Sequence, residues 1–357
     1  METNTLDAAV KKLLHEGTVI PAHPLALDQN RQLDEKRQRG LTQYYMASGA
    51  GGIAVGVHTT QFEIRDPKIN LYARVLQLAA EEITAARLTR PFIKVAGIVG
   101  PTKQAIAEAE ITVNYGYDLG LLSMGGLQDW TEKQIIERVK SIAAVIPVFG
   151  FYLQPSVGGR IFSYDFWLEF AKIPNVHAIK VAAFNRYQTL DVVRAVCSSG
   201  RQNEIAMYTG NDDNIVQDLL TTYRFETDGK IVEKDFVGGL LGHWAVWTRK
   251  AVELLEEVKK CKDNAGSGTT ELLTTGIEVT DMNAAIFDPS HSFHGCIPGI
   301  HEVLRRQGLL EGRWCLNPEE ELSPGQMEEI DRVYNAYPHL TDDNFVKELL
   351  SQNAFKY

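Results

Sequence analysis

A single lysine interrupts an apolar stretch of the sequence, NVHAIKVAAFN at residues 175–185. The stretch is typical of a buried strand, and lysine is almost never fully buried without a partner or a purpose. Loss of water around Lys180 disfavours the ammonium form, so the amine becomes available as a nucleophile. Such an amine forms a Schiff base with a carbonyl compound. An ion-paired structural lysine is the alternative, and the strand alone does not separate the two.

A tyrosine follows the preceding apolar stretch, GFYLQPSVGG at residues 150–159. If both stretches are adjacent parallel strands, they lie about 4.8 Å apart, and Tyr152 and Lys180 both reach the same end of the sheet. A phenol beside an amine can move a proton during formation and breakdown of a carbinolamine. The alternative for Tyr152 is a packed aromatic side chain.

Alternating elements would position these side chains. From residue 18 onward, apolar β-branched stretches alternate with longer helical patterns, and eight such units are complete by about residue 262. Nearly all-apolar strands indicate a parallel sheet buried on both faces. Eight units favour a (β/α)8 TIM barrel, in which the carboxyl ends of the strands carry the active site. The predicted strands lie in TVIPAHPL, GGIAVGV, FIKVAGIVG, DLGLLSM, VFGFYLQ, VHAIKVA, EIAMYTG and FVGGLLG.

A boundary is predicted in KDNAGSGTT at residues 262–270, where the alternation ends in a polar, glycine-containing segment. Two helical patterns follow it, IHEVLRRQGLL and SPGQMEEIDRVYNAY. We therefore expect a barrel domain over residues 1–262 and a C-terminal helical extension over 263–357.

The composition of the 357 residues excludes several classes of protein. A formal net charge of −10 without a polybasic block argues against a nucleic-acid partner. The four cysteines are far apart and are typical of reduced intracellular thiols. The N-terminal segment has no signal-peptide pattern, and no apolar run reaches the roughly 20 residues of a membrane helix. These features predict a cytoplasmic protein with no membrane partner.

The motifs in their order resemble the dihydrodipicolinate synthase/N-acetylneuraminate lyase family, the pyruvate-dependent class I aldolases on a (β/α)8 barrel. HAIKVAAFN resembles the family's Schiff-base strand, and FYLQPSVGG resembles its tyrosine-x-x-proline motif, with Tyr152 and Pro155 in register. The resemblance covers roughly residues 17–335. It implies that Lys180 forms an imine with a 2-keto acid and that Tyr152 transfers a proton. No metal or organic cofactor is required, because the iminium itself is the electrophile.

Two further segments carry the resemblance and imply the substrate-binding residues. AVGVHTTQF is similar to the family's segment after the second strand, where His58 and Thr59 take the places that grip the keto-acid carboxylate. YTGNDD is similar to the seventh-strand end of the lyase branch, where Gly210, Asp212 and Asp213 would meet a polyhydroxylated substrate. The alternative for the two aspartates is capping of the following helix.

The sequence also departs from the synthase branch. LLSMGGLQDW has no tyrosine after the fourth strand, and Val157 replaces the arginine expected two residues after the motif's proline, with Arg160 three residues later. These differences indicate an enzyme that is not a true dihydrodipicolinate synthase, with an aldehyde or sugar acid as second substrate. The resemblance implies a homo-oligomer, a dimer or a tetramer. Two alternatives stay open: a sugar-acid dehydratase that uses the same imine, and a non-catalytic barrel that binds a keto acid or sugar acid.

Overall fold

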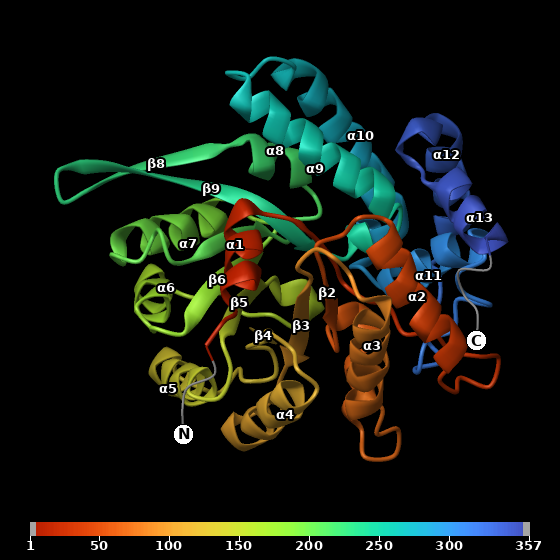
Figure 1. Cartoon of the computed structure of the whole chain (residues 1–357), viewed down its shortest axis with the longest axis horizontal. Helices are drawn as coiled ribbons and strands as arrows, with labels where there is room; N and C mark the ends of the chain where they lie inside the picture. The colour runs from red at the N-terminus through yellow and green to blue at the C-terminus, as the bar shows by residue number, and fades with distance from the viewer. Residues whose placement is uncertain (1–4, 353–357) are drawn as a thin grey trace. The chain divides into compact units, whose positions relative to one another are not determined.

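The computed structural model describes residues 5–352 (Figure 1). The chain divides into two units, each assembled from segments far apart in the sequence. Unit 1 contains residues 5–18 and 91–240, and unit 2 contains residues 19–90 and 241–352.

Unit 1 is built on a parallel sheet with the strand order β9-β7-β6-β5-β4-β3. Helices separate these strands along the chain, as parallel pairing requires. Figure 1 shows helices α4–α7 outside the strands of this unit. The strands are β3 (Ile93–Ile98), β4 (Leu119–Leu122), β5 (Val148–Leu153), β6 (Val176–Ala182), β7 (Ala206–Thr209) and β9 (Lys230–Leu241). The helices are α1 (Ala8–Glu16), α4 (Thr102–Asn114), α5 (Glu132–Ala143), α6 (Tyr164–Ala171), α7 (Arg186–Ser198) and α8 (Ile215–Leu220).

Short polar side chains fix where these helices begin. The hydroxyl of Thr131 accepts the N–H of Gln134 at 3.3 Å, and the Gln134 side chain accepts the N–H of Thr131 at 2.8 Å, which forms a capping box at the start of α5. Asn185 accepts two backbone N–H groups at the start of α7, directly after the strand that carries Lys180. The caps therefore set the lengths of the loops at the carboxyl ends of the strands.

The two faces of the unit 1 sheet have different environments. A Cβ at Gly150 would meet the ring of Phe170 on α6, so Gly150 lies on the helix-covered face. Residues in the adjacent register positions therefore lie on the opposite, inner face, since successive side chains alternate. Phe149 and Tyr208 make a T-shaped contact on this inner face, with ring centroids 5.3 Å apart. The Tyr208 hydroxyl donates to the carbonyl of Leu14 on α1.

One element of unit 1 differs from the prediction. The sequence NIVQDLLTTYRF, expected to be one helix, is helical only to Leu220, and Thr222–Thr227 forms strand β8. β8 pairs antiparallel with β9 through a two-residue turn at Asp228 and Gly229, both of which have positive φ. Such a turn matches the twist of a hairpin. The hairpin extends from unit 1 as a two-stranded ribbon at the left of Figure 1.

Unit 2 contains two short strands and most of the C-terminal helices. The two strands are β1 (Val19–Pro21) and β2 (Gly52–Val55), and a parallel bridge joins Ala22, directly after β1, to Ala54 within β2. The 3-10 turn η1 (His58–Thr60) follows β2. The helices are α2 (Glu35–Ala47), α3 (Tyr72–Ala86), α9 (Thr248–Asp263), α10 (Thr269–Phe287), α11 (Cys296–Arg306), α12 (Gln326–Ala336) and α13 (Asp343–Ser351). The predicted boundary at 262–270 falls on the turn between α9 and α10, and its role as a domain boundary stays a prediction.

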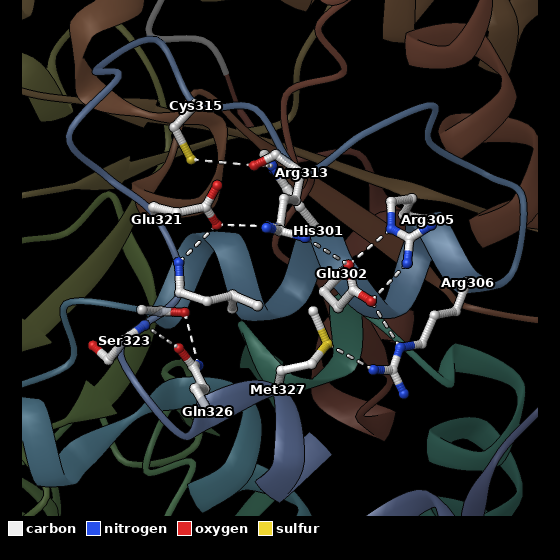
Figure 2. A network of polar contacts seen from close by, with 12 residues as sticks. His301, Glu302, Arg305, Arg306, Arg313, Cys315, Glu321, Ser323, Gln326 and Met327 are labelled. Carbon is white, nitrogen blue, oxygen red and sulfur yellow. Dashed lines mark hydrogen bonds and ion pairs between the residues drawn. The ribbon is translucent and has the colours of Figure 1, made fainter. Parts of the chain in front are cut away.

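A buried carboxylate organises the C-terminal helices of unit 2. Glu302 on α11 has a side chain with no exposed surface. It accepts two hydrogen bonds from Arg305 and one from Arg306, each at 2.8 Å, and Arg313 lies 3.6 Å away (Figure 2). Arg313 also pairs with Glu321, so the network connects α11 to the segment between α11 and α12. A buried charge is tolerated only with such partners.

Taken along the chain, eight parallel strands alternate with helices, and helices α10–α13 follow the last unit. The predicted fold class, a (β/α)8 TIM barrel with a C-terminal helical extension, is confirmed. In the described part of the chain, no helix combines the length and the apolar character needed to cross a membrane.

Candidate active site

Lys180 lies on the inner face of unit 1, near the carboxyl end of β6. Its register partners are Phe151 on β5 and Tyr208 on β7, so the three side chains share one face. Only 8% of the residue is exposed. Burial lowers the pKa of the Lys180 ammonium to about 8, although the negative charge of Asp212 acts in the opposite direction. A substantial fraction of this amine is therefore unprotonated in mildly alkaline solution.

Phe151 forms one side of the lysine's surroundings. The Lys180 Nζ lies 4.4 Å from the centroid of the Phe151 ring. At this distance the π face attracts an ammonium group but offers it no hydrogen bond. The ring thus holds the position of Nζ and also keeps water from that side. Phe151 could not be identified as a site residue from the sequence, because an apolar residue inside an apolar strand looks like any other core residue.

Gly210, at the end of β7, leaves room for the lysine chain. A Cβ at Gly210 would lie 2.4 Å from the Lys180 Cε and 2.9 Å from both its Cγ and the Cβ of Ala182. Real Cβ atoms do not approach other carbon atoms so closely, so a side chain at this position displaces the lysine. The predicted substrate-binding residue Gly210 is therefore in contact with Lys180.

Asp212 and Asp213 follow in the turn after β7, but their surroundings differ. Asp212 is only 5% exposed, and its charge acts on Lys180, whereas Asp213 is exposed. Helix α8 begins at Ile215 with Asn214 at its N-cap, and the Asn214 side chain makes no capping hydrogen bond. Asn214, rather than either aspartate, therefore occupies the N-cap position of α8. Their predicted role in binding a substrate stays a prediction.

A buried asparagine connects the loops that follow β6 and β7. The Asn211 Oδ1 accepts the N–H of Phe184 at 3.0 Å, and its Nδ2 donates to Asp218 at 2.8 Å. Phe184 has a φ of 50°, which is an unfavourable backbone conformation for a residue of this size. Positions of this kind cluster at functional sites. Asn211 was not among the predicted site residues, and its position inside NDDN was the one available signal.

Tyr152 does not share the inner face with Lys180. Its register partner is Val181, so it points to the helix-covered face, where its ring lies 5.0 Å from that of Trp167 on α6. The Tyr152 hydroxyl accepts the N–H of Phe162 at 3.4 Å, and burial raises the pKa of the phenol. Both residues lie at the carboxyl end of the sheet, as expected, but on opposite faces; the role of Tyr152 in proton transfer stays a prediction.

A β-bulge causes this difference. Val148 pairs with Val176, but the next residue, Phe149, pairs with Ala178, so His177 is the extra residue on β6. Without the bulge, Tyr152 would be directly opposite Lys180, because both lie equally far from the Val148–Val176 pair. A shift of one residue exchanges the faces of a strand.

His58 and Thr59 belong to unit 2, in the 3-10 turn η1 after β2. Thr59 is 2% exposed, and its hydroxyl has no hydrogen-bond partner; the same is true of the Nε2 of Gln61, which is 1% exposed. By contrast, the hydroxyl of Thr60 accepts from Gly56 and donates to the His23 carbonyl. Buried donors without partners are rare, and an ordered water or a ligand can supply the missing acceptor. The predicted set did not include Gln61.

Within residues 5–352, no group of three or more histidine, cysteine, aspartate or glutamate side chains is arranged to hold a metal ion. His291 forms a hydrogen bond with Asp288 at 2.6 Å. The four cysteines are buried and form no disulfide.

Known sequences and known structures give different results. No protein-family model and no curated protein matches the sequence. Solved structures match closely in fold. Dihydrodipicolinate synthase from Oceanobacillus iheyensis has a TM-score of 0.71 and 17% identity, and the match covers 92% of this chain and 99% of that one.

N-Acetylneuraminate lyase from Fusobacterium nucleatum complexed with pyruvate has a TM-score of 0.70 and 16% identity, over 92% and 99% of the two chains. Sialic acid aldolase from Ruminococcus gnavus has a TM-score of 0.70 and 16% identity, over 92% and 98%. The resemblance seen in the sequence is thereby confirmed for the fold.

Proposed function

We propose that this chain, which has the fold of dihydrodipicolinate synthases and N-acetylneuraminate lyases, is a class I carbon–carbon lyase. It acts on pyruvate or a related 2-keto acid through an imine on Lys180. The observation that carries the proposal is the buried amine of Lys180, which has a pKa of about 8. It lies on the inner face of the sheet, near the carboxyl end of β6. Barrel enzymes place their catalytic groups at these strand ends.

The reaction begins when the neutral amine of Lys180 attacks the keto carbon, which gives a carbinolamine. Protonation of its hydroxyl releases water and forms the iminium. Loss of a proton from the methyl carbon then gives an enamine, which attacks an aldehyde; in the cleavage direction these steps reverse. The iminium withdraws electrons from the bond that forms or breaks, so the chemistry needs no further electrophile.

Asp212 is the group that we propose for proton transfer. It is buried, and its charge acts on Lys180. A carboxylate there accepts the proton that the amine must lose and returns it to the departing hydroxyl. The sequence assigned this role to Tyr152, but its hydroxyl accepts from Phe162 on the other face of the sheet. We therefore propose Asp212, rather than Tyr152, as the group that transfers the proton.

The remaining predicted residues would bind the substrate. Thr59, with its unpartnered buried hydroxyl, and His58 would hold the keto-acid carboxylate. Asp213, exposed after β7, would meet hydroxyl groups of an aldehyde or sugar acid. Val157 stands where the synthase branch has its arginine, and the Nη1 of Arg160 donates to the carbonyls of Leu127 and Trp130. This supports an activity other than dihydrodipicolinate synthesis. The buried cysteines, which form no disulfide, suit a cytoplasmic enzyme.

Exchange of the methyl protons of pyruvate tests the proposal without knowledge of the second substrate. An enamine takes up deuterium from D2O, and proton NMR follows the loss of the methyl signal. Lys180→Ala should reduce the exchange rate by roughly 10³-fold or more, because the group that forms the imine is gone.

Lys234→Ala is the matched control. Burial also lowers the pKa of Lys234 to about 8, but its Nζ donates to the carbonyl of Gln202. The control should exchange at the rate of the unaltered protein. Equal rates in all three proteins, with pyruvate and with longer 2-keto acids, would remove the lyase proposal.

A further inference from the structure

Strand β8 is an open edge. It pairs with β9 and, among the described residues, with no other strand. The hairpin has a defined geometry: the rings of Tyr223 and Phe236 meet at 5.9 Å, and Arg224 forms an ion pair with Glu233 at 2.6 Å. Unpaired edges are a template for a further strand, and proteins usually block them with proline, lysine or a covering element. β8, with the sequence TYRFET, contains neither proline nor lysine.

The turn determines which backbone groups of β8 point outward. A two-residue turn makes Thr227 and Lys230 a hydrogen-bonded pair, and such pairs alternate along an antiparallel ladder. Phe225 is therefore hydrogen-bonded to Val232 on β9. The N–H and C=O groups of Arg224 and Glu226 point away from β9, toward the open edge.

The sequence of β8 is complementary to itself. If a second β8 runs antiparallel with its centre at Phe225, Arg224 faces Glu226 of the other strand, and Glu226 faces Arg224. Both side chains are exposed in the single chain. The outward backbone groups belong to the same two residues, so each oppositely charged pair is also a hydrogen-bonded pair. At the centre, the two Phe225 rings form a cross-strand aromatic pair.

We propose that β8 is a self-association site at which a second copy of this chain adds its own β8 antiparallel, with the two-fold axis at Phe225. The product is a continuous four-stranded sheet in the order β9-β8-β8-β9. The contact is short compared with the roughly 1,200–2,000 Å² of a standard interface. Association through it should therefore depend on protein concentration and weaken with salt, since opposite charges stabilise it.

A cysteine at the axis tests the register. Facing residues of a non-hydrogen-bonded pair have Cα atoms about 4.5 Å apart, which a disulfide can bridge. Phe225→Cys should form a disulfide-linked dimer under mild oxidation. Thr227→Cys is the matched control, because residue 227 would face Tyr223 of the second copy and lie about 14 Å from its own equivalent. The native cysteines are buried and leave the background low.

Charge reversal tests the complementarity in the Phe225→Cys protein. Arg224→Glu alone and Glu226→Arg alone should each lose cross-linking, because like charges then face each other. A mixture of the two should regain it, since every facing pair is again opposite. The double variant Arg224→Glu, Glu233→Arg keeps an ion pair inside the hairpin with its charges reversed. It should still lose cross-linking, because the glutamate introduced at position 224 then faces Glu226 of the second copy. Normal cross-linking in this variant would mean that Arg224 acts by stabilising the hairpin and not by pairing between copies.

Cross-linking of Phe225→Cys at least about tenfold faster than Thr227→Cys, together with rescue on mixing, would establish the pairing. Equal rates, or rates that the charge reversals leave unchanged, would overturn it. Oligomers that form through another surface would not bring the two cysteines introduced at position 225 together. They would therefore give no disulfide-linked dimer of Phe225→Cys.

Discussion

Gly210 and Lys180 are packed so closely that the glycine can carry no side chain: a Cβ there would lie 2.4 Å from the lysine Cε. The lysine chain occupies the space that the side chain of residue 210 would otherwise fill. The position of the amine therefore depends on a residue that takes no part in the chemistry.

Gly210→Ala should displace Lys180 and reduce methyl-proton exchange by about 10²-fold, since small displacements of reacting groups have effects of this size. The free energy of unfolding should fall by about 1–3 kcal/mol from overpacking. Gly200→Ala is the control, because a Cβ there meets nothing within 4 Å although its φ is positive. It should lose stability but keep its exchange rate. Normal exchange in Gly210→Ala would show that the lysine has room to move.

Phe151→Leu should lower the pKa of Lys180 below about 8. The substitution keeps an apolar neighbour but removes the π face 4.4 Å from Nζ, which favours the ammonium form by about 0.5–2 kcal/mol. The pH dependence of exchange checks this, because the rate rises as the amine loses its proton. The midpoint should move to lower pH; a midpoint that rises would mean that the ring acts mainly by excluding water.

Asp212→Asn should also shift the midpoint to lower pH, because the negative charge of Asp212 raises the pKa of Lys180. If Asp212 transfers the proton, the maximal rate falls as well, by about 10²-fold. Asp213→Asn, at the exposed neighbouring position, should change neither quantity. A shifted midpoint with an unchanged maximal rate would limit Asp212 to an electrostatic role.

Tyr152→Phe should reduce the exchange rate by no more than a few-fold. The hydroxyl accepts one long hydrogen bond from Phe162 and faces the helices rather than Lys180. The measurement decides between the outward orientation of Tyr152 in the strand pairing and the catalytic role that the tyrosine-x-x-proline motif implies. A loss of about 10²-fold or more, typical of general acid–base groups, would restore the role that the motif predicts.

Glu302→Gln should destabilise the protein by about 1.5–3 kcal/mol at pH 7, because it removes the buried carboxylate that accepts the charged hydrogen bonds of Arg305 and Arg306. Burial alone raises the pKa of Glu302, but the hydrogen bonds from Arg305 and Arg306 outweigh it, and the pKa is lowered from 4.5. The carboxylate therefore contributes stability above pH 4.5 and loses it as pH falls through the lowered pKa.

Denaturant unfolding at pH 7 and in acid checks both parts of this prediction. The difference between Glu302→Gln and the unaltered protein should shrink in acid. Glu329→Gln is the control, since its ion pair with Arg332 is half exposed; it should change stability by less than about 1 kcal/mol. A pH-independent difference would mean that shape, not charge, stabilises α11.

The alternating elements of the fold could be predicted from the sequence because buried parallel strands are apolar throughout and each is followed by a helical period. Lys180 could be identified for the same reason, as the polar exception in such a strand. The β8–β9 hairpin was missed because TTYRF was included in the preceding helix, although Asp228-Gly229 is a typical hairpin turn.

The orientation of Tyr152 could not be predicted, because it depends on the bulge at His177. A bulge changes which residues face each other without a fixed sequence pattern, so spacing along two strands does not determine which side chains meet. Phe151 and Asn211 were missed for a related reason: their importance comes from what they contact across strands and loops.

Locating a trapped imine tests most directly whether Lys180 is the residue that binds the keto acid. The protein is incubated with pyruvate, reduced with borohydride and digested, and mass spectrometry identifies the modified residue. We expect a reductively attached pyruvate on Lys180, with none on Lys234 despite its similarly lowered pKa. An adduct on another lysine, or none with pyruvate and longer 2-keto acids, would contradict it.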